Sequence, residues 1–310
     1  MAKNTIKFKW KTEEKTGFSI NISFDNKDIS KEDNFISVDW GEGKTDIYNG
    51  KGQTFYWLGF KTFTHDYSCT GEEFQVTIQT PEHCDSIGFV TKPDYYCPYN
   101  INVTELDLSC APDLITLDLS YLSAKELDVS QNTKLKWLSW NGENITKLDL
   151  SNNLDLEYFS PDKPIAHLDL SKHKKLKELY LCDSTTDYSH CLALETLQII
   201  GNSIDVSNLV NLKTLFCCEN ELTALDVSKN PRLKHLHCHD NNLTELDLSN
   251  NPNLKQLDCY GNPLTSLKLH PKTFFGMSKK LKKELAKMGF DVEKQVENLV
   301  DNAVSLSSQN

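Results

Sequence analysis

The sequence predicts a mostly β chain with an N-terminal β-sandwich, a solenoid of short repeats and a short α-helical cap at the C-terminus. Three observations support this fold class. Alternating apolar runs separated by polar turns fill the start of the chain, a 21-residue pattern repeats after them, and an amphipathic segment follows the last repeat. We therefore expect three parts, residues 1–95, residues 96–272 and residues 273–310.

Composition limits the possible functions. The 310 residues are 38% hydrophobic and 25% charged, which is typical of a globular protein with a sizeable core. The net charge of -11 argues against nonspecific nucleic-acid binding, and no apolar run is long enough to span a membrane. The N-terminus lacks the apolar core and cleavage site of a signal peptide, so the sequence predicts a cytoplasmic protein.

The first 95 residues lack the repeat. Runs such as "TIKFKWK", "FSINISF", "NFISVDW", "KTFTHDY" and "EFQVTIQT" alternate with polar turns, which indicates a small antiparallel β-sandwich. The phrase "GEGKT" at residues 41–45 is similar to the end of a phosphate-binding loop. That motif would need a glycine at Val38 and a following helix, and the sequence has neither.

Other residues of this region carry a family resemblance. The phrases "VDWGEG", "THDY" and "GEEFQVTI" resemble the W-G-D-G turn, H-x-Y corner and final V-x-I strand of the PKD-like immunoglobulin-fold domain, with Glu42 in place of the usual Asp. The residues that the resemblance makes structural are Trp40, His65 and Tyr67.

The repeat occupies residues from about 101 to about 270. Its most regular copies begin at Leu212, Leu233 and Leu254 and read L-x-x-L-x-C-x-x-N-x-L-T-x-L-D-(L/V)-S-x-N-P. Earlier copies are less regular, and Leu179, Leu197 and Leu215 are only 18 residues apart. Such a pattern predicts about eight turns of a solenoid, each burying its apolar stripe against its neighbours.

Two segments of each turn are predicted to be strands, the L-x-L or L-x-C segment and the "LDLS" segment about ten residues later. Asn and Pro in "NNP", "KNP" and "GNP" predict the corners. The second segment should carry a column of aspartates: Asp118, Asp128, Asp149, Asp169, Asp226 and Asp247. We expect these aspartates to act in hydrogen bonding and solubility, with calcium binding across turns as the alternative.

The phrase "KHLHCHD" at residues 234–240 raises the question of a metal or catalytic site. The repeat register directs Cys238 inward, in line with Cys217 and Cys259, so we expect a column of reduced core thiols. The outward positions of the same strand hold His235, His237 and His239. Two of them, His237 and His239, could still share a metal with a third ligand from an adjacent turn. Cys182 and Cys218 face the opposite way and are the better candidates for reactive or exposed thiols.

Outward positions of the L-x-L strands form columns rich in aromatic and histidine residues, a composition typical of protein interfaces. The predicted ligand-binding residues are Trp137, Tyr158, Tyr180, Phe216, His235, His237, Asp258 and Tyr260. The sequence contains no H-E-x-x-H and no G-x-S-x-G, and the register brings no Cys and His together as a catalytic pair. We therefore expect a non-enzymatic module without a cofactor, with a metal-dependent enzyme or metal sensor using the three histidines as the alternative.

After the last repeat, Leu281, Leu285 and Met288 lie on one face of a predicted helix, with Ser278 as its N-cap and Gly289 as its end. A second helix is predicted in "DVEKQVENLVDNAV". Lysines make the first helix basic, which could suggest anionic membranes. Capping of the exposed apolar end of the solenoid is the favoured interpretation.

A PKD-like sandwich before repeats of the form LxxLxCxxNxLTxLDLSxNPx resembles the leucine-rich-repeat proteins common in Bacteroidetes bacteria. The resemblance implies a leucine-rich-repeat solenoid that binds a protein, or less readily a glycan, and it supplies no catalytic residue. It also implies a cell-surface or secreted location as the alternative to the cytoplasm. We expect a monomer whose partner is a protein of unknown identity.

Overall fold

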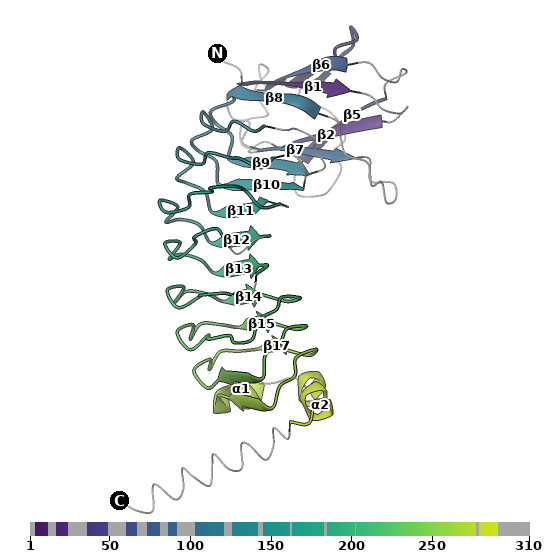
Figure 1. Cartoon of the computed structure of the whole chain (residues 1–310). Helices are drawn as coiled ribbons and strands as arrows, with labels where there is room; N and C mark the ends of the chain where they lie inside the picture. Colours follow the sequence, from purple (N-terminus) through teal and green to yellow (C-terminus); the bar gives the residue numbers. More distant parts are fainter. Residues whose placement is uncertain are drawn as a thin grey trace, which may run out of the picture. The chain divides into compact units, whose positions relative to one another are not determined.

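The computed structural model describes residues 4–11, 17–23, 36–48, 60–66, 73–80, 86–91, 103–120, 126–141, 145–161, 163–182, 185–201, 203–276 and 279–290 (Figure 1). The chain divides into two compact units, Met1–Leu176 and Lys177–Asn310. Within the described ranges, none of the helices has the length and apolar character needed to cross a membrane.

The first unit contains two sheets. One has antiparallel neighbours in the order β4 (Thr45–Tyr48), β3 (Ile36–Asp39), β6 (Glu73–Thr80), β1 (Asn4–Lys11) and β8 (Val103–Cys110). The other runs β5 (Phe60–Asp66), β2 (Gly17–Ser23), β7 (Ser86–Thr91), β9 (Thr116–Ser120), β10 (Trp137–Asn141) and β11 (Tyr158–Pro161). The five N-terminal strands that the sequence predicts are confirmed. Strand β7, which precedes residue 95, pairs in parallel with β9 of the repeats, so one hydrogen-bonded sheet includes strands from both sides of the expected boundary.

The "VDWGEG" phrase forms the turn between β3 and β4. Trp40 is fully buried, and its Nε1 donates a hydrogen bond of 2.9 Å to Asp46 Oδ2. Gly41 has a φ of +85°, and a Cβ there would lie 2.6 Å from the carbonyl oxygen of Gln75, so only glycine fits. These residues therefore shape a hairpin, as expected for a structural Trp40. The His65 side chain and Tyr67 lie outside the described residues.

In the second unit, the L-x-L segments form a parallel sheet. Its order is β12 (Glu178–Leu181), β13 (Thr196–Ile199), β14 (Thr214–Phe216), β15 (His235–His237) and β17 (Gln256–Asp258). The central leucines of these strands pair in register and are at most 1% exposed: Leu179, Leu197, Leu215, Leu236 and Leu257. The turns of 18 and of 21 residues therefore keep one register, as the sequence predicts.

The "LDLS" segments differ from the prediction. Among the described "LDLS" segments of the second unit, the two that pair as strands are β16 (Glu245–Leu248) and β18 (Ser266–Leu269). At the aspartate position of β18 the chain has Lys268, whose Nζ lies 3.2 Å from Asp247 Oδ2 on β16. In the described column, opposite charges face each other only between these two strands, which favours their pairing. A second correction concerns Asp118. It lies on β9, where it pairs with Ser139 of β10 in the sheet of L-x-L strands, and therefore does not belong to the column of the "LDLS" segments. The aspartate that precedes Asp128 in the column is instead Asp107, whose charge acts to raise the pKa of Asp128.

The aspartates of these segments close local turns. In eight described copies the carboxylate accepts the backbone N–H of the serine two residues later, at 2.8 to 3.0 Å. The hydrogen bonds from serine backbone and hydroxyl groups lower the pKa of each aspartate, for example Asp128 and Asp205. Hydrogen bonding, the role expected from the sequence, is therefore confirmed.

The inward third-leucine position holds Cys217, Cys238 and Cys259 in the last three turns, each at most 2% exposed. Burial raises the pKa of Cys217 and of Cys259 to about 12 and that of Cys238 well above 9.0, so these thiols stay protonated. The predicted column of core thiols is confirmed. Desolvation also raises the pKa of Cys218, which argues against the reactive thiol suggested there.

Two helices follow the repeats. Helix α1 (Pro271–Gly276) is not predicted by the sequence pattern, and it begins inside the expected last repeat. The predicted helix is α2 (Lys279–Lys287), with Leu285 1% exposed. It ends as expected at Gly289, whose φ is +89° and whose N–H bonds to Ala286 O, while Phe290 N–H bonds to Leu285 O. Ser278, the Leu281 side chain and the predicted second helix lie outside the described residues.

Buried asparagines link successive turns. In the first unit, Asn153 donates through Nδ2 to the carbonyls of Val129 and Asn132 at 3.0 and 2.9 Å. The next copy of the repeat has His173 at this position, and it is only 1% exposed. Neither of its ring nitrogens makes a hydrogen bond with good geometry within the described part of the chain. Burial lowers the pKa of His173 from 6.5, and the nearby carbonyls of Leu150 and Leu170 offset part of this effect.

We predict that His173→Asn stabilises the protein by about 1 kcal/mol, because an asparagine can donate to the carbonyls that the other turns use. A lowered histidine pKa means that stability is full above pH 6.5 and falls as the pH drops from 6.5 towards the folded-state value. Urea unfolding at about pH 7.5 and about pH 5.5 measures both effects. The variant should lose less stability at the lower pH than the parent does. An equal loss, or a loss reduced as much by the exposed control His190→Asn, would contradict the assignment.

We also predict that alkylation separates the cysteines into two classes. Cys110 is exposed and should react in the native protein, whereas Cys217, Cys238 and Cys259 should react at least about a hundredfold more slowly, because little thiolate forms and access is closed. Peptide mapping after iodoacetamide treatment gives the rates. In denaturant all four should react alike. Native labelling of Cys238 at the rate of Cys110 would show that the thiol column is open.

Candidate functional site

The outward side chains of the parallel sheet in the second unit, from β12 to β17, stand in columns because its strands pair in register. Tyr180 faces Gln198, which faces Phe216 on β14. Phe216 pairs with His237 on β15, and His237 pairs with Asp258 on β17. The structure therefore brings four of the predicted site residues, Tyr180, Phe216, His237 and Asp258, into one column, and the neighbouring column contains His235.

Contacts run through three successive turns in the central column. The rings of Phe216 and His237 stack with centroids 4.6 Å apart and planes inclined by 16°. His237 Nδ1 lies 2.6 Å from Asp258 Oδ2, which also accepts a hydrogen bond of 3.2 Å from Gln256 Nε2. The side chains of His237 and Asp258 are 16% and 30% exposed, so the pair is partly desolvated. These contacts hold the imidazole in one orientation, with its plane along the phenyl ring.

A second stack lies in the next column. His239 and Tyr260 stack with centroids 4.5 Å apart and planes inclined by 6°, and His239 Nδ1 lies 2.9 Å from Asp240 Oδ2. Tyr260 is 54% exposed although its ring is held on one face. Partial desolvation raises the pKa of Tyr260, and the charges of Asp240, Asp258 and Glu219 add to the effect. The phenol is therefore neutral and lies in a negative field.

We name this surface the ring face and define it by Phe216, His237, His239, Asp258 and Tyr260. Each ring is fixed by a neighbour in an adjacent turn, so the surface is organised before any ligand arrives. The sequence predicts an outward His239 and names it only in the metal alternative, so it is missing from the predicted ligand-binding residues. The signal was available, since His239 and Tyr260 are 21 residues apart and occupy the same place in the repeat.

The remaining predicted aromatic residues belong to the first unit. Trp137 and Tyr158 stack almost in parallel, with centroids 3.4 Å apart and planes inclined by 3°. Trp137 is 39% exposed, and its Nε1 donates to Ser139 Oγ at 3.3 Å. In the second unit the Tyr180 hydroxyl donates to Glu178 Oε2 at 3.2 Å.

The metal alternative receives no support from the geometry. The described part of the chain contains no group of three or more His, Cys, Asp or Glu side chains placed to hold a metal ion. Cys238 faces the core, whereas His237 and His239 make their contacts through Nδ1 with separate carboxylates, Asp258 and Asp240. The three histidines of "KHLHCHD" are therefore arranged as parts of two stacked pairs and one neighbouring column.

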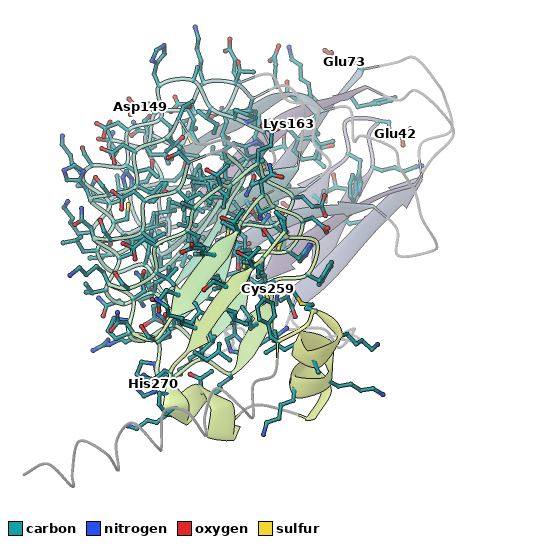
Figure 2. All side chains as sticks on the ribbon, turned by 60° about the horizontal axis from the view of Figure 1, so that its bottom comes forward. Glu42, Glu73, Asp149, Lys163, Cys259 and His270 are labelled. Atoms are coloured by element: carbon teal, nitrogen blue, oxygen red, sulfur yellow. The ribbon has the colours of Figure 1, made fainter. Side chains whose placement is uncertain are left out.

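A pocket of about 300 Å³ borders the ring face at β17. Asp258 and Tyr260 line it from the last turn of the sheet, and Lys287 and Met288 line it from the end of α2. Figure 2 views this end of the chain, with Cys259 beside α2. The sequence could not predict the pocket because it depends on how α2 packs against the last turn.

Comparison with known proteins identifies the repeat. Residues 231–272 match the family model described as Leucine Rich repeats (2 copies), and a search of curated proteins gives no match. The functional domain of InlJ from Listeria monocytogenes, which includes a cysteine ladder, is 22% identical, with 57% of each chain covered and a TM-score of 0.37. Internalin C2 of the same species is 18% identical, with 61% of this chain and 84% of the other covered and a TM-score of 0.46.

A leucine-rich-repeat protein of Leptospira interrogans, LIC12759, is 19% identical, with 58% of this chain and 54% of the other covered and a TM-score of 0.42. The chain spans less than two thirds of the InlJ structure and of an internalin, inlF, from Listeria monocytogenes, 57% and 62% respectively. The family model establishes that this chain contains leucine-rich repeats.

Proposed function

We propose that the chain is a non-catalytic module that binds a protein, or less readily a glycan, through the ring face. The observation that carries this proposal is the pair of stacks, Phe216 on His237 and His239 on Tyr260, fixed across successive turns. Rigid aromatic side chains lose little conformational entropy on binding and are enriched among the residues that dominate interface energies. Leucine-rich repeats are commonly protein-interaction modules, which supports the same function.

The surface chemistry also favours binding over catalysis. The carboxylate of Asp258 is held by His237 and Gln256, and no nucleophile among the described residues of the ring face is paired with a base. A partner can instead contact the phenol of Tyr260 and the edges of the imidazoles. The Trp137 and Tyr158 pair supplies a further aromatic contact surface within the first unit.

We further propose that residues 1–95 form the PKD-like domain and residues 96–272 the leucine-rich-repeat domain. The antiparallel pairing of β1 with β6 and of β2 with β5 supports a β-sandwich in the first of these ranges. The burial of Trp40 and the positive φ of Gly41 support a structural W-G turn of the kind that the resemblance implies.

We predict that the double variant Tyr180→Ala and Phe216→Ala reduces capture of the partner at least about tenfold, because truncating a central aromatic anchor costs about 1.4 kcal/mol or more. The immobilised chain is exposed to extract and growth medium of the organism that encodes it, and captured proteins are quantified by mass spectrometry. Unfolding should change by at most about 1.5 kcal/mol, since both side chains are only half-buried.

Leu192→Ala is the matched control, because Leu192 is an exposed apolar residue at a turn corner away from the ring face. Proteins captured equally by the parent and by Leu192→Ala, but lost with the double variant, would support the proposal. Equal capture by the double variant and the parent would refute it.

A further inference from the structure

The pocket beside β17 lies where the ring face meets α2. Its base is apolar, because Leu257, Cys259 and Leu285 are each at most 2% exposed. Its rim combines the Asp258 carboxylate with the ring of Tyr260. A volume of about 300 Å³ is at the lower end of the range for ligand pockets and suits one large side chain.

The charges around the pocket select a cation. Asp240, Asp258 and Glu219 all act on the Tyr260 hydroxyl, whereas Lys287 is the single cation among the residues that line the pocket. Lys287 is exposed at the end of α2, and its ammonium can turn into solvent on its flexible stem. With the Lys287 ammonium turned into solvent, the Asp258 carboxylate is the charge that remains at the rim, and Asp240 and Glu219 near Tyr260 make the surrounding field more negative.

Both polar contacts that the Asp258 side chain makes with the described residues end on Oδ2, the one with His237 Nδ1 at 2.6 Å and the one with Gln256 Nε2 at 3.2 Å. Oδ1 can therefore accept a hydrogen bond from a ligand. His239 holds one face of the Tyr260 ring, and the ring is still 54% exposed because β17 is the last strand of its sheet. The other ring face is open to a planar group.

We propose that this pocket binds an arginine side chain of the partner protein. The guanidinium would stack on the open face of Tyr260 and donate to Asp258, while the aliphatic stem packs on Leu257 and Met288. Arginine fits better than lysine, because only a planar fork can stack on the ring and donate to a carboxylate at once. This inference deepens the proposed function and rests on it for the identity of the ligand as part of a protein.

The test uses N-acetyl-arginine amide as the probe and the full chain labelled at the methionine methyl groups. The chain has three methionines, so the Met288 signal can be assigned by substitution. We expect saturable shifts of the Met288 methyl signal at millimolar probe. N-acetyl-citrulline amide has the same shape without the charge and should bind at least about tenfold more weakly, because a charge-assisted hydrogen bond is lost.

Asp258→Asn should weaken arginine amide at least about tenfold, and its amide oxygen can still accept from His237, so the face is expected to stay folded. Tyr260→Ala removes the ring on which the guanidinium stacks and should weaken arginine amide about threefold or more, which checks the pocket independently of Asp258. Asp247→Asn lies on β16 outside the pocket and is the matched control, with no change expected.

Absence of saturable shifts at Met288, equal binding of citrulline amide, or unchanged binding by Asp258→Asn would each overturn the arginine pocket. This test needs no partner, whereas the capture experiment uses Tyr180 and Phe216, which do not line the pocket. Capture without arginine-amide binding would leave the proposed function standing and refute only the pocket. Arginine-amide binding without capture of a partner would leave the pocket standing and refute the proposed function.

Discussion

The repeats depend on buried asparagines whose side-chain N–H groups donate to carbonyls of the neighbouring turn. In the second unit, Asn251 is fully buried and donates through Nδ2 to the carbonyls of Val227 and Asn230, each at 3.0 Å. Asn230 does the same with Val206 and Leu209. A slip of one residue would move these amides away from their acceptors and leave buried polar groups without partners, at a cost of about 1 to 3 kcal/mol each. The amides therefore fix the register that stacking of leucines alone would leave loose.

A second asparagine column adds the same constraint at the other corner. Asn241 donates to the carbonyls of Cys217 and Cys238, and its Oδ1 accepts the N–H of Leu222. Asn262 repeats this arrangement one turn later with Cys238, Cys259 and Leu243.

The aspartates of the "LDLS" segments show which electrostatic effect dominates. Neighbouring charges oppose ionisation of Asp128, but its hydrogen bonds from Ser130 outweigh them, and its pKa falls.

Much of this fold could be predicted because each repeat position has one physical role. Leucine and cysteine that alternate with period two face inward, so the pattern alone predicts the buried thiols and the outward columns. Asp118 was misassigned because "LDLS" occurs in both segments, and only pairing with β10 distinguishes them. The pairing of the "LDLS" segments could not be predicted, because it depends on which charges face each other across the segments. Helix α1 could not be predicted either, because it depends on packing against the last turn.

The candidate site was predicted at the level of columns and not of contacts. Register places Phe216, His237 and Asp258 in line, but the orientation of the rings follows from side-chain packing between turns. The same distinction explains why the ring face can serve recognition. The inward leucines and the corner asparagines specify the solenoid, so the outward positions carry little of its stability. Their residues can vary without loss of the fold. The accumulation of stacked rings and paired carboxylates on and beside β14, β15 and β17 is therefore not needed for folding, and it supports the proposal that this surface recognises a partner.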